Sequence, residues 1–443
     1  MKKTLSLILI ITLSFFLFSC PEPEETTSGI TTLTYSGTLS FGEWLGILED
    51  IYDQKNFVNL DLSSCSVSNT GGSAFIDYVH HGKSFKIFNA LPWLTNPTDI
   101  NFSEEALAAK NKIVSIILPK SATMIDYSQD GQSSSAFRDF IYLRSVTGEN
   151  IEVVGSYAFY GLKNLRDVNF PFAGIGVSAP PAVHPASEAD VTPINGYFAH
   201  IDDFAFAECS RLARISFPHA RIIGRSAFEN SGLISISISD LPSVWIIYQG
   251  AFRGCKDLTS VSFRSVTKIG NEAFANSGLK TASFTANLLR PFTTGYPIIS
   301  GLKVVYDSVI FYERAFIGSK SLQRLEVPNA WNVYFAADSL ANIGTHLDLQ
   351  LFDHDQEYDG SGINSHWHPQ IEDYLGDRTS GTGTHPRTIN SVTLILPSIE
   401  DEEQSHVMYF ADETVDGKKI GTIYKDLHAR YGEGAIKVTV QRY

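Results

Sequence analysis

The sequence predicts a β-rich solenoid, with one short strand in each coil of about 22 to 24 residues. Two observations carry this prediction. An Ala-Phe pair recurs along the middle of the chain at a nearly fixed interval, and an alternating apolar segment follows six of the seven pairs. Because this period is absent near both ends, we expect an N-terminal α/β cap and a small C-terminal α+β unit beside the coils.

The Ala-Phe pairs set the period of the coils. Successive phenylalanines differ by 22, 47, 22, 24, 22 and 42 residues, so four intervals are single repeats and two are near-doublings that contain insertions. A single coil cannot bury its own phenylalanine, and neighbouring coils must cover it. We therefore expect the rings to form one continuous file, with equivalent residues about 4.8 Å apart. The seven phenylalanines are Phe137, Phe159, Phe206, Phe228, Phe252, Phe274 and Phe316.

The alternating segment predicts a short strand with one buried face. A leucine stands five or six residues after the phenylalanine, and two more apolar residues follow it three and five residues later. Three of these strands run directly into proline, which ends the hydrogen-bonded ladder. The predicted buried pairs are Val168 with Phe170, Ile215 with Phe217, Ile236 with Ile238, Val261 with Phe263, Ala282 with Phe284, and Leu325 with Val327.

The full repeat resembles the BspA-like subclass of leucine-rich repeats. Its pattern is I-G-x-x-A-F-x-x-C/S-x-L-x-x-I-x-F-P, and it is clearest in residues 205–212 and 269–274. We assign residues 110–348 to these repeats. The resemblance implies a leucine-rich-repeat solenoid on a bacterial cell surface, where several members of the family are implicated in adhesion to host proteins or other cells.

The N-terminus predicts a lipoprotein signal peptide over residues 1–19. Two lysines precede an apolar run that is shorter than the roughly 20 residues needed to span a membrane. The Ser-Cys step at its end resembles a bacterial lipobox, which implies lipid attachment at Cys20 and a place in the outer membrane or at the cell surface. An ordinary secretory signal with a chance cysteine is the alternative, and the leaflet stays open. Residues 20–29 are acidic, lack apolar residues to bury, and predict a tether.

The regions flanking the repeats predict small structured modules. Residues 30–109 form the expected cap, in which Ser40 and Glu43 fit a capping box before a helix over 41–52, and a strand follows over 57–62. Such a cap would cover the open end of the solenoid. Residues 349–388 predict a polar loop, and residues 389–443 predict the α+β unit, with strands over 392–397 and 435–440 and a helix over 422–431.

Composition and motifs favour binding over catalysis. The chain has 34 basic and 48 acidic residues, and its net charge of -14 argues against nucleic acid as a partner. Phosphate loops, nucleophile elbows and H-E-x-x-H motifs are absent, so we predict no enzyme, cofactor or metal. Asp353, His354, Asp355, His366 and His368 are the only metal-ligand constellation, but their spacing favours a solvated loop.

Two cysteines occupy equivalent positions in coils that are two repeats apart. Cys209 and Cys255 each follow their phenylalanine by three residues. Their expected separation, about twice 4.8 Å, exceeds the Cα limit of about 7 Å for a disulfide. We therefore predict that both are unpaired thiols.

Two kinds of position are candidates for ligand binding. The first comprises outward strand residues. Four consecutive serines among them permit close approach of another surface, although serine is also simply tolerated there, and Arg214 and Arg324 lie one position earlier on the same face if a local kink brings both positions outward. The second comprises two insertions, over 172–199 and 286–308, which either recognise ligands or are neutral. The candidate residues are Asn169, Arg214, Ser216, Ser237, Ser262, Ser283, Arg324 and Glu326 on the strands, and Arg290, Phe292 and Tyr296 in the second insertion.

These features favour a non-enzymatic surface lipoprotein that binds proteins or glycans of the host or of neighbouring cells. An envelope scaffold or assembly protein that uses the solenoid for protein–protein contacts is the first alternative. A metal-dependent hydrolase centred on the histidine-rich stretch is the second. The sequence leaves the identity of the ligand and the oligomeric state open.

Overall fold

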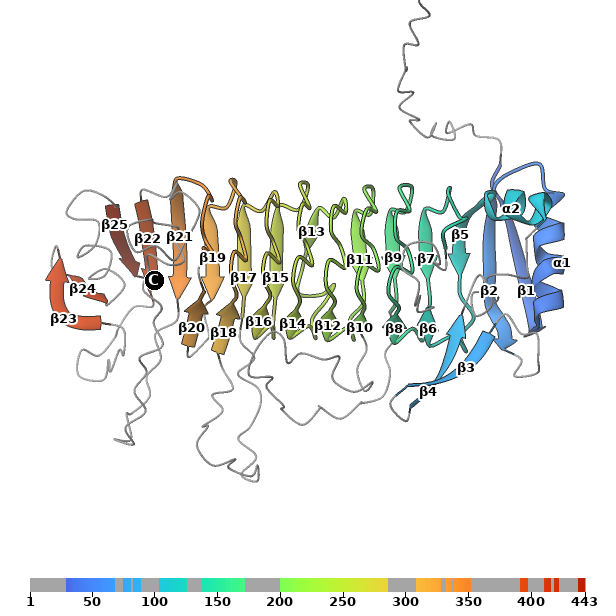
Figure 1. Ribbon diagram of the computed structural model, residues 1–443, viewed down its shortest axis with the longest axis horizontal. Helices are drawn as coiled ribbons and strands as arrows, with labels where there is room; N and C mark the ends of the chain where they lie inside the picture. The colour runs from blue at the N-terminus through green and yellow to red at the C-terminus, as the bar shows by residue number, and fades with distance from the viewer. Residues whose placement is uncertain are drawn as a thin grey trace, which may run out of the picture.

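The computed structural model is an elongated stack of coils (Figure 1). It describes residues 29–67, 75–80, 83–88, 103–125, 137–171, 200–285, 308–327, 332–336, 338–351, 391–396, 410–415, 418–421 and 437–442. Each repeat in the middle of the stack contributes a strand to one side and a shorter strand to a second side, while a turn makes up the third. The predicted β-rich solenoid is confirmed.

Two parallel sheets lie end to end along the first side of the stack. The order in the first is β1-β2-β5-β7-β9-β11, and the order in the second is β13-β15-β17-β19-β21-β22-β25. The strands of the first are β1 (Thr31–Leu39), β2 (Val58–Val67), β5 (Ile113–Ile117), β7 (Ser145–Thr147), β9 (Asp167–Asn169) and β11 (Arg214–Ser216). Those of the second are β13 (Ser235–Ile236), β15 (Ser260–Phe263), β17 (Thr281–Phe284), β19 (Arg324–Val327), β21 (His346–Leu351), β22 (Ser391–Leu396) and β25 (Lys437–Arg442).

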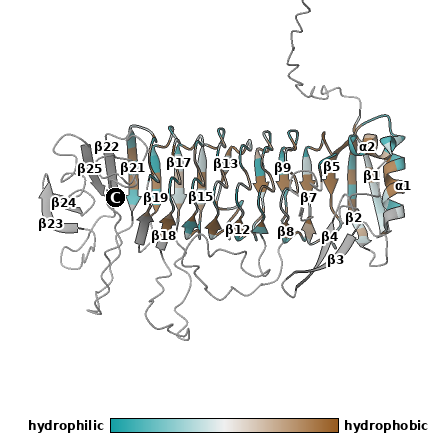
Figure 2. Cartoon of the chain, viewed as in Figure 1, coloured by the Kyte–Doolittle hydropathy of each residue, from teal (hydrophilic) through white to brown (hydrophobic). Residues whose placement is uncertain are grey.

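A ten-stranded sheet forms the second side of the stack. Six of its strands have only two residues, and five of these contain the apolar residue that stands five positions before an Ala-Phe phenylalanine, as at Ile223 and Ile247. Figure 2 shows apolar residues in described strands of this side, such as β12. In sheet order the strands are β20 (Asn332–Phe335), β18 (Ser308–Phe311), β16 (Lys268–Ile269), β14 (Ile246–Ile247), β12 (Ile222–Ile223), β10 (His200–Ile201), β8 (Val153–Val154), β6 (Met124–Ile125), β4 (Lys83–Phe88) and β3 (Phe75–His80).

The N-terminal end of the stack carries both described helices, α1 (Phe41–Tyr52) and α2 (Glu104–Lys110) (Figure 1). The capping box predicted for α1 is confirmed, because the Ser40 amide donates to Glu43 at 2.6 Å and the Glu43 amide donates to the Ser40 hydroxyl at 3.3 Å. The predicted strand over 57–62 overlaps the first half of β2, which begins at Val58 and pairs in parallel with β5. The cap region therefore shares a sheet with the repeats.

The C-terminal strands also continue a repeat sheet. β22 and β25 correspond to the strands predicted over 392–397 and 435–440, and both run parallel to β21. A two-stranded antiparallel sheet, β23 (Phe410–Val415) with β24 (Lys418–Gly421), lies in the same region. The helix predicted over 422–431 lies outside the described residues.

The Ala-Phe phenylalanines lie in one file, as predicted. All seven are fully buried, and neighbouring rings are nearly parallel, with interplanar angles of 11° or less. The amide of Phe228 donates to the carbonyl of Ala251 in the next coil at 2.8 Å, and the other central phenylalanines make the same bond. The successive ring-centroid distances are 4.7, 4.9, 5.2, 5.3, 5.1 and 5.4 Å.

The turn that carries each phenylalanine depends on left-handed backbone conformations. In coil after coil the residue two positions after the phenylalanine has a positive φ, and most residues at this position are glycine or asparagine, the types that tolerate it. Glu208 is the exception, with φ 63, and it accepts a hydrogen bond from Asn230 at 2.7 Å. The residues at this position are Gly161, Glu208, Asn230, Gly254, Asn276 and Gly318, and Asn342 has the same conformation two residues after Leu340.

Within the described residues, neither helix is long enough and apolar enough to cross a membrane. The predicted signal peptide over 1–19, Cys20 and most of the tether lie outside the described residues. The same holds for nearly all of both insertions, including Arg290, Phe292 and Tyr296, and for the histidine-rich stretch.

Candidate ligand-binding surface

One coil interrupts the otherwise regular outer face of the stack. The coil of residues 228–251, here called the Phe228 coil, is 24 residues long, whereas the coils on either side have 22. The strand β11 precedes its outer segment and β13 lies within it, yet these two strands belong to different sheets. The sheet is therefore broken at the Phe228 coil, while the phenylalanine file inside continues without a gap.

The break results from three additional residues, and it corrects one prediction. Ile215 and Phe217 are two residues apart, but the corresponding buried residues of the Phe228 coil, Ile236 and Leu241, are five apart. The amide of Phe217 donates to the carbonyl of Asp240 at 2.9 Å, so the ladder resumes one residue before Leu241. Ile238, predicted as a buried strand residue, is instead 39% exposed. The prediction was wrong because Ile236-Ser237-Ile238 has the apolar–polar alternation of a strand, although the last two residues belong to the insertion.

The additional residues form a compact turn. The amide and the hydroxyl of Ser237 both donate to the carboxylate of Asp240, at 2.7 and 2.6 Å, and the Asp240 amide donates back to the Ser237 carbonyl at 3.0 Å. Ser237, predicted as an outward strand residue, therefore lies just beyond the two-residue strand β13 and holds this turn. The turn presents Ile238 to solvent.

Gly232 lies at the other end of the same outer segment, where the backbone approaches the preceding coil closely. In the Phe228 coil, five residues separate Leu233 from its phenylalanine, whereas six separate Leu212 and Leu258 from theirs. The shortened turn places Gly232 directly against the carbonyl group of Ser210, where a Cβ atom would overlap the oxygen. Only glycine fits at this distance, so the backbone lies deeper here than in the coils on either side.

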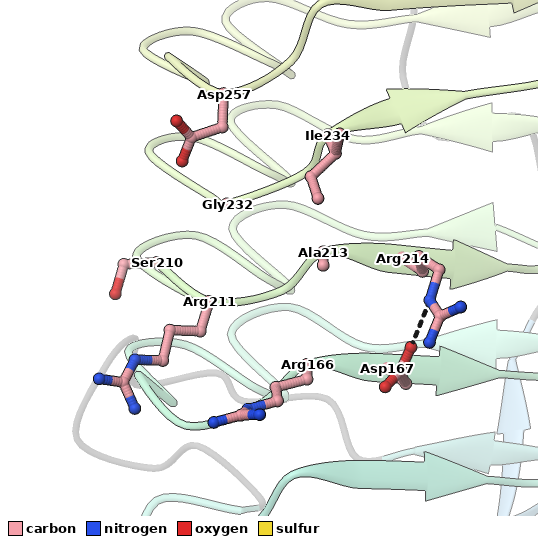
Figure 3. A pocket seen from close by; sticks show the side chains of 9 residues that line it. All are labelled: Arg166, Asp167, Ser210, Arg211, Ala213, Arg214, Gly232, Ile234 and Asp257. Carbon is pink, nitrogen blue, oxygen red and sulfur yellow. Dashed lines mark hydrogen bonds and ion pairs between the residues drawn. The ribbon is translucent and has the colours of Figure 1, made fainter. Parts of the chain in front are cut away.

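The recess opens a hollow of about 690 Å³ on the outer face, here called the Gly232 hollow (Figure 3). Figure 3 shows the side chains of Arg211 and Arg166 extending to one side of it, from successive coils, with Asp257 on the opposite side of Gly232. Ala213 occupies the position that Arg166 has in the preceding coil, and its small side chain leaves the space between the arginines and Asp257 open. The lining residues are Arg166, Asp167, Ser210, Arg211, Ala213, Arg214, Gly232, Ile234 and Asp257.

The hollow is cationic in an acidic protein. Its lining contains three arginines and two aspartates, whereas the whole chain has a net charge of -14. Arg214 forms an ion pair with Asp167 at 2.8 Å, but the Arg214 side chain remains 80% exposed. Arg211 donates to the side-chain amide oxygen of Asn164 at 3.1 Å, a contact that helps to orient the guanidinium.

Two large aliphatic side chains are exposed on this coil. Ile234, which lines the hollow, is 53% exposed, and Ile238 at the turn is exposed as well. Ile234 directly follows the buried Leu233 in the sequence, and its own side chain faces outward. The fully buried core of a protein interface is more apolar than the rest of the surface, and arginine is enriched in interfaces.

The structure brings together only some of the predicted binding residues. Arg214 lines the hollow, and Ser216 and Asn169 pair with each other on the adjoining strands β11 and β9. Farther along the face, Ser283 lies between Ser262 and Glu326 in register, and Arg324 pairs with Glu326. Sequence reasoning missed Arg166, Arg211, Ile234 and Asp257, although the short turn at Gly232 was a visible signal.

The buried thiols are unsuited to catalysis. Cys209 and Cys255 are free and fully buried, as predicted, and each thiol lies 3.0 Å from a carbonyl oxygen of the phenylalanine file. Burial raises the pKa of both thiols to about 12, so the nucleophilic thiolate is scarce at neutral pH. Within the described ranges, no group of three or more potential metal ligands comes together.

Stacked coils with parallel strands and a buried file of apolar residues define the leucine-rich-repeat class of solenoid proteins. The sequence matches the profile of the BspA type leucine rich repeat region in six copies, over residues 56–178 and 192–290. The chain therefore belongs to the BspA-type leucine-rich repeat family. Proteins of this family are typically bacterial surface proteins, their repeats generally mediate protein–protein contacts, and they are generally non-enzymatic.

Solved structures of two bacterial proteins are similar to the chain. One is a leucine-rich repeat protein from Bacteroides ovatus ATCC 8483, at 14% identity and a TM-score of 0.39, covering 83% of this chain and 74% of that one. The other is a leucine rich cell surface protein from Faecalibacterium prausnitzii A2-165, at 14% identity and a TM-score of 0.26, covering 74% of this chain and 87% of that one. No curated protein matches the sequence.

Proposed function

We propose that this chain is a non-enzymatic, lipid-anchored protein of the bacterial cell envelope that binds proteins or glycans of the host or of neighbouring cells. The observation that carries the proposal is the outer face at the Phe228 coil, where a hollow lined by three arginines of the two preceding coils adjoins the exposed side chains of Ile234 and Ile238. A rigid stack fixes these groups in place, so little conformational entropy is lost when a ligand binds.

The anchor in this proposal is a lipid on Cys20. The supporting observations are the short apolar leader, the Ser-Cys step at its end and the acidic tether that follows. A Cys20→Ala variant is expected to leave the membrane fraction and to lack the mass of the lipid. Labelling of intact cells with a membrane-impermeant reagent is expected to mark the protein at the outer membrane or cell surface.

Binding can be tested with the full-length protein on host epithelial cells, immobilised matrix proteins and neighbouring bacteria. The double variant Ile234→Glu/Ile238→Glu is expected to lose most of the binding. The double variant Ile30→Glu/Ile117→Glu is a matched control, because Ile30 and Ile117 are exposed to 50% and 39%, close to the 53% and 39% of the first pair. Equal binding by both double variants would contradict the proposed surface.

The remaining predicted positions are proposed as secondary contacts. The two insertions, with Arg290, Phe292 and Tyr296, would extend the surface, and a variant lacking both insertions that bound at full strength would exclude them. If intact cells protect the protein from external protease and it captures only envelope proteins of its own cell, the scaffold role would replace adhesion.

A further inference from the structure

The Gly232 hollow has a charge opposite to that of the protein around it. Its three arginines come from two successive coils and outnumber the two aspartates of the lining, and Asn164 orients Arg211 by accepting a hydrogen bond from it. The whole chain has a net charge of -14, whereas the lining of the hollow has one more arginine than aspartate, so an anionic ligand is favoured at this position over an average one. The hollow therefore selects for negative charge.

Arginine also restricts the kind of anion. Its planar guanidinium presents parallel N–H groups that match the two oxygens of a carboxylate, and such paired bonds are stronger and more directional than neutral ones. Arg214 already binds a carboxylate in this hollow through a single bond, in which its Nε atom donates to Asp167 Oδ1 at 2.8 Å. A ligand carboxylate could bind Arg166 and Arg211, which line the same hollow, in a similar way.

The neighbouring apolar groups indicate what carries the carboxylate. Ile234 lines the hollow and Ile238 lies on the turn at the far end of the same outer segment, both with substantial exposure. None of the nine residues that line the hollow is aromatic. Aliphatic side chains gain by covering apolar groups of a partner, which a peptide supplies through its own side chains and an acidic sugar largely lacks.

We propose that the Gly232 hollow binds an acidic segment of a protein partner, in which an Asp or Glu side chain contacts Arg166 and Arg211 and a neighbouring aliphatic side chain covers Ile234. This inference rests on the proposed function and names the ligand class of its site. The partner is thus a protein and not an acidic polysaccharide.

A selection from a random peptide display library on the immobilised full-length protein tests this inference. The enriched peptides are expected to contain Asp or Glu next to Leu, Ile or Val. In fluorescence anisotropy their affinity is expected to fall roughly tenfold or more for Arg166→Glu/Arg211→Glu and to fall with increasing salt. The matched control is Arg264→Glu/Lys280→Glu, a double charge reversal at exposed positions of the same face, which is expected to bind as the unaltered protein does.

The outcomes separate this inference from the proposed function. Peptides without acidic enrichment, or acidic peptides that bind Arg166→Gln/Arg211→Gln undiminished, would overturn the ligand class. Binding of polygalacturonate in preference to the peptides would replace the protein partner by an acidic glycan. In either case, loss of cell binding in Ile234→Glu/Ile238→Glu would still support the surface itself, whereas retained cell binding would remove the surface.

Discussion

The inside and the outside of the Phe228 coil follow different rules. Inside, the ring of Phe228 stacks on Phe206 and Phe252 at 5.2 and 5.3 Å, with interplanar angles of 4° and 1°. Outside, the same coil has a shortened turn, three additional residues and a broken sheet. The comparison teaches that the stack tolerates changes in length only where they leave the phenylalanine file in register.

Hydrogen bonding explains this division. The amide of Phe206 donates to Ala227 at 2.7 Å and the amide of Phe228 donates to Ala251 at 2.8 Å, so the backbone of the file is tied to the next coil at each step. The outer segment is tied to the file only through its buried side chains, among them Ile236 and Leu241. Residues inserted between these two can leave the sheet without breaking a bond of the file.

Removing a ring from the file is expected to have the largest effect. Phe228→Ala should lower the free energy of unfolding by about 3 to 5 kcal/mol, because it leaves a cavity between two tightly stacked neighbours. Denaturant unfolding of the full chain measures this change. Ile238→Ala, on the outside of the same coil, should change it by less than about 0.5 kcal/mol. Similar losses in both variants would erase the distinction between inside and outside.

Substitutions at two glycines, Gly232 and Gly278, can separate an effect on stability from an effect on binding. Gly232→Ala and Gly278→Ala each place a Cβ atom on a backbone carbonyl of the preceding coil, at Ser210 and Lys256. Each should lower the free energy of unfolding by about 1 to 3 kcal/mol, while Gly46→Ala, with nothing within 4 Å of its added Cβ, serves as the control. Only Gly232→Ala should also weaken cell binding, and equal weakening by Gly278→Ala would contradict the proposed site.

A smaller effect on stability is expected from Lys110, an ionisable side chain that is buried at the N-terminal end of the stack. Lys110 is fully buried, with Asp139 at 3.9 Å, and burial lowers its pKa from 10.5 to about 7. The unfolded chain therefore binds more protons between these two pH values, and stability should rise as pH increases from 7 toward 10. Lys110→Met should remove this part of the rise and add about 1 to 2 kcal/mol at pH 7. Thermal unfolding across this range measures both, and an unchanged pH dependence in the variant would exclude the effect.

Much of the fold could be predicted from the sequence because its determinants are periodic. The phenylalanine file and the buried strand residues, such as Val261 and Phe263, follow from residue type and spacing. The ten-stranded sheet was not predicted, because two-residue strands such as β12 are too short to show alternation. Ile238 was wrongly placed in the interior because Ile236-Ser237-Ile238 alternates as a strand does, although residue 238 lies in an insertion. The Leu241-Pro242 step, which corresponds to Phe217-Pro218 of the preceding coil, marked the true position of the second buried residue.

The candidate site was less accessible to sequence reasoning. Arg214 was found because it lies on a strand, whereas Arg166 stands just before a strand and Arg211 lies in a turn of the next coil. Their proximity depends on Gly232 packing against a backbone carbonyl, a contact between coils that no single repeat reveals. Stacking, and not the motif itself, thus produces the site.

Deleting Ser237, Ile238 and Ser239 tests the central claim most directly. The deletion leaves Ile236-Asp240-Leu241-Pro242, which matches Ile215-Ser216-Phe217-Pro218 of the preceding coil. The account predicts that the variant folds with undiminished thermal stability, because the file is untouched, and that its binding to cells is largely lost. A variant that is stable and binds cells as strongly as the unaltered chain would contradict the claim that the broken sheet at the Phe228 coil is the binding surface.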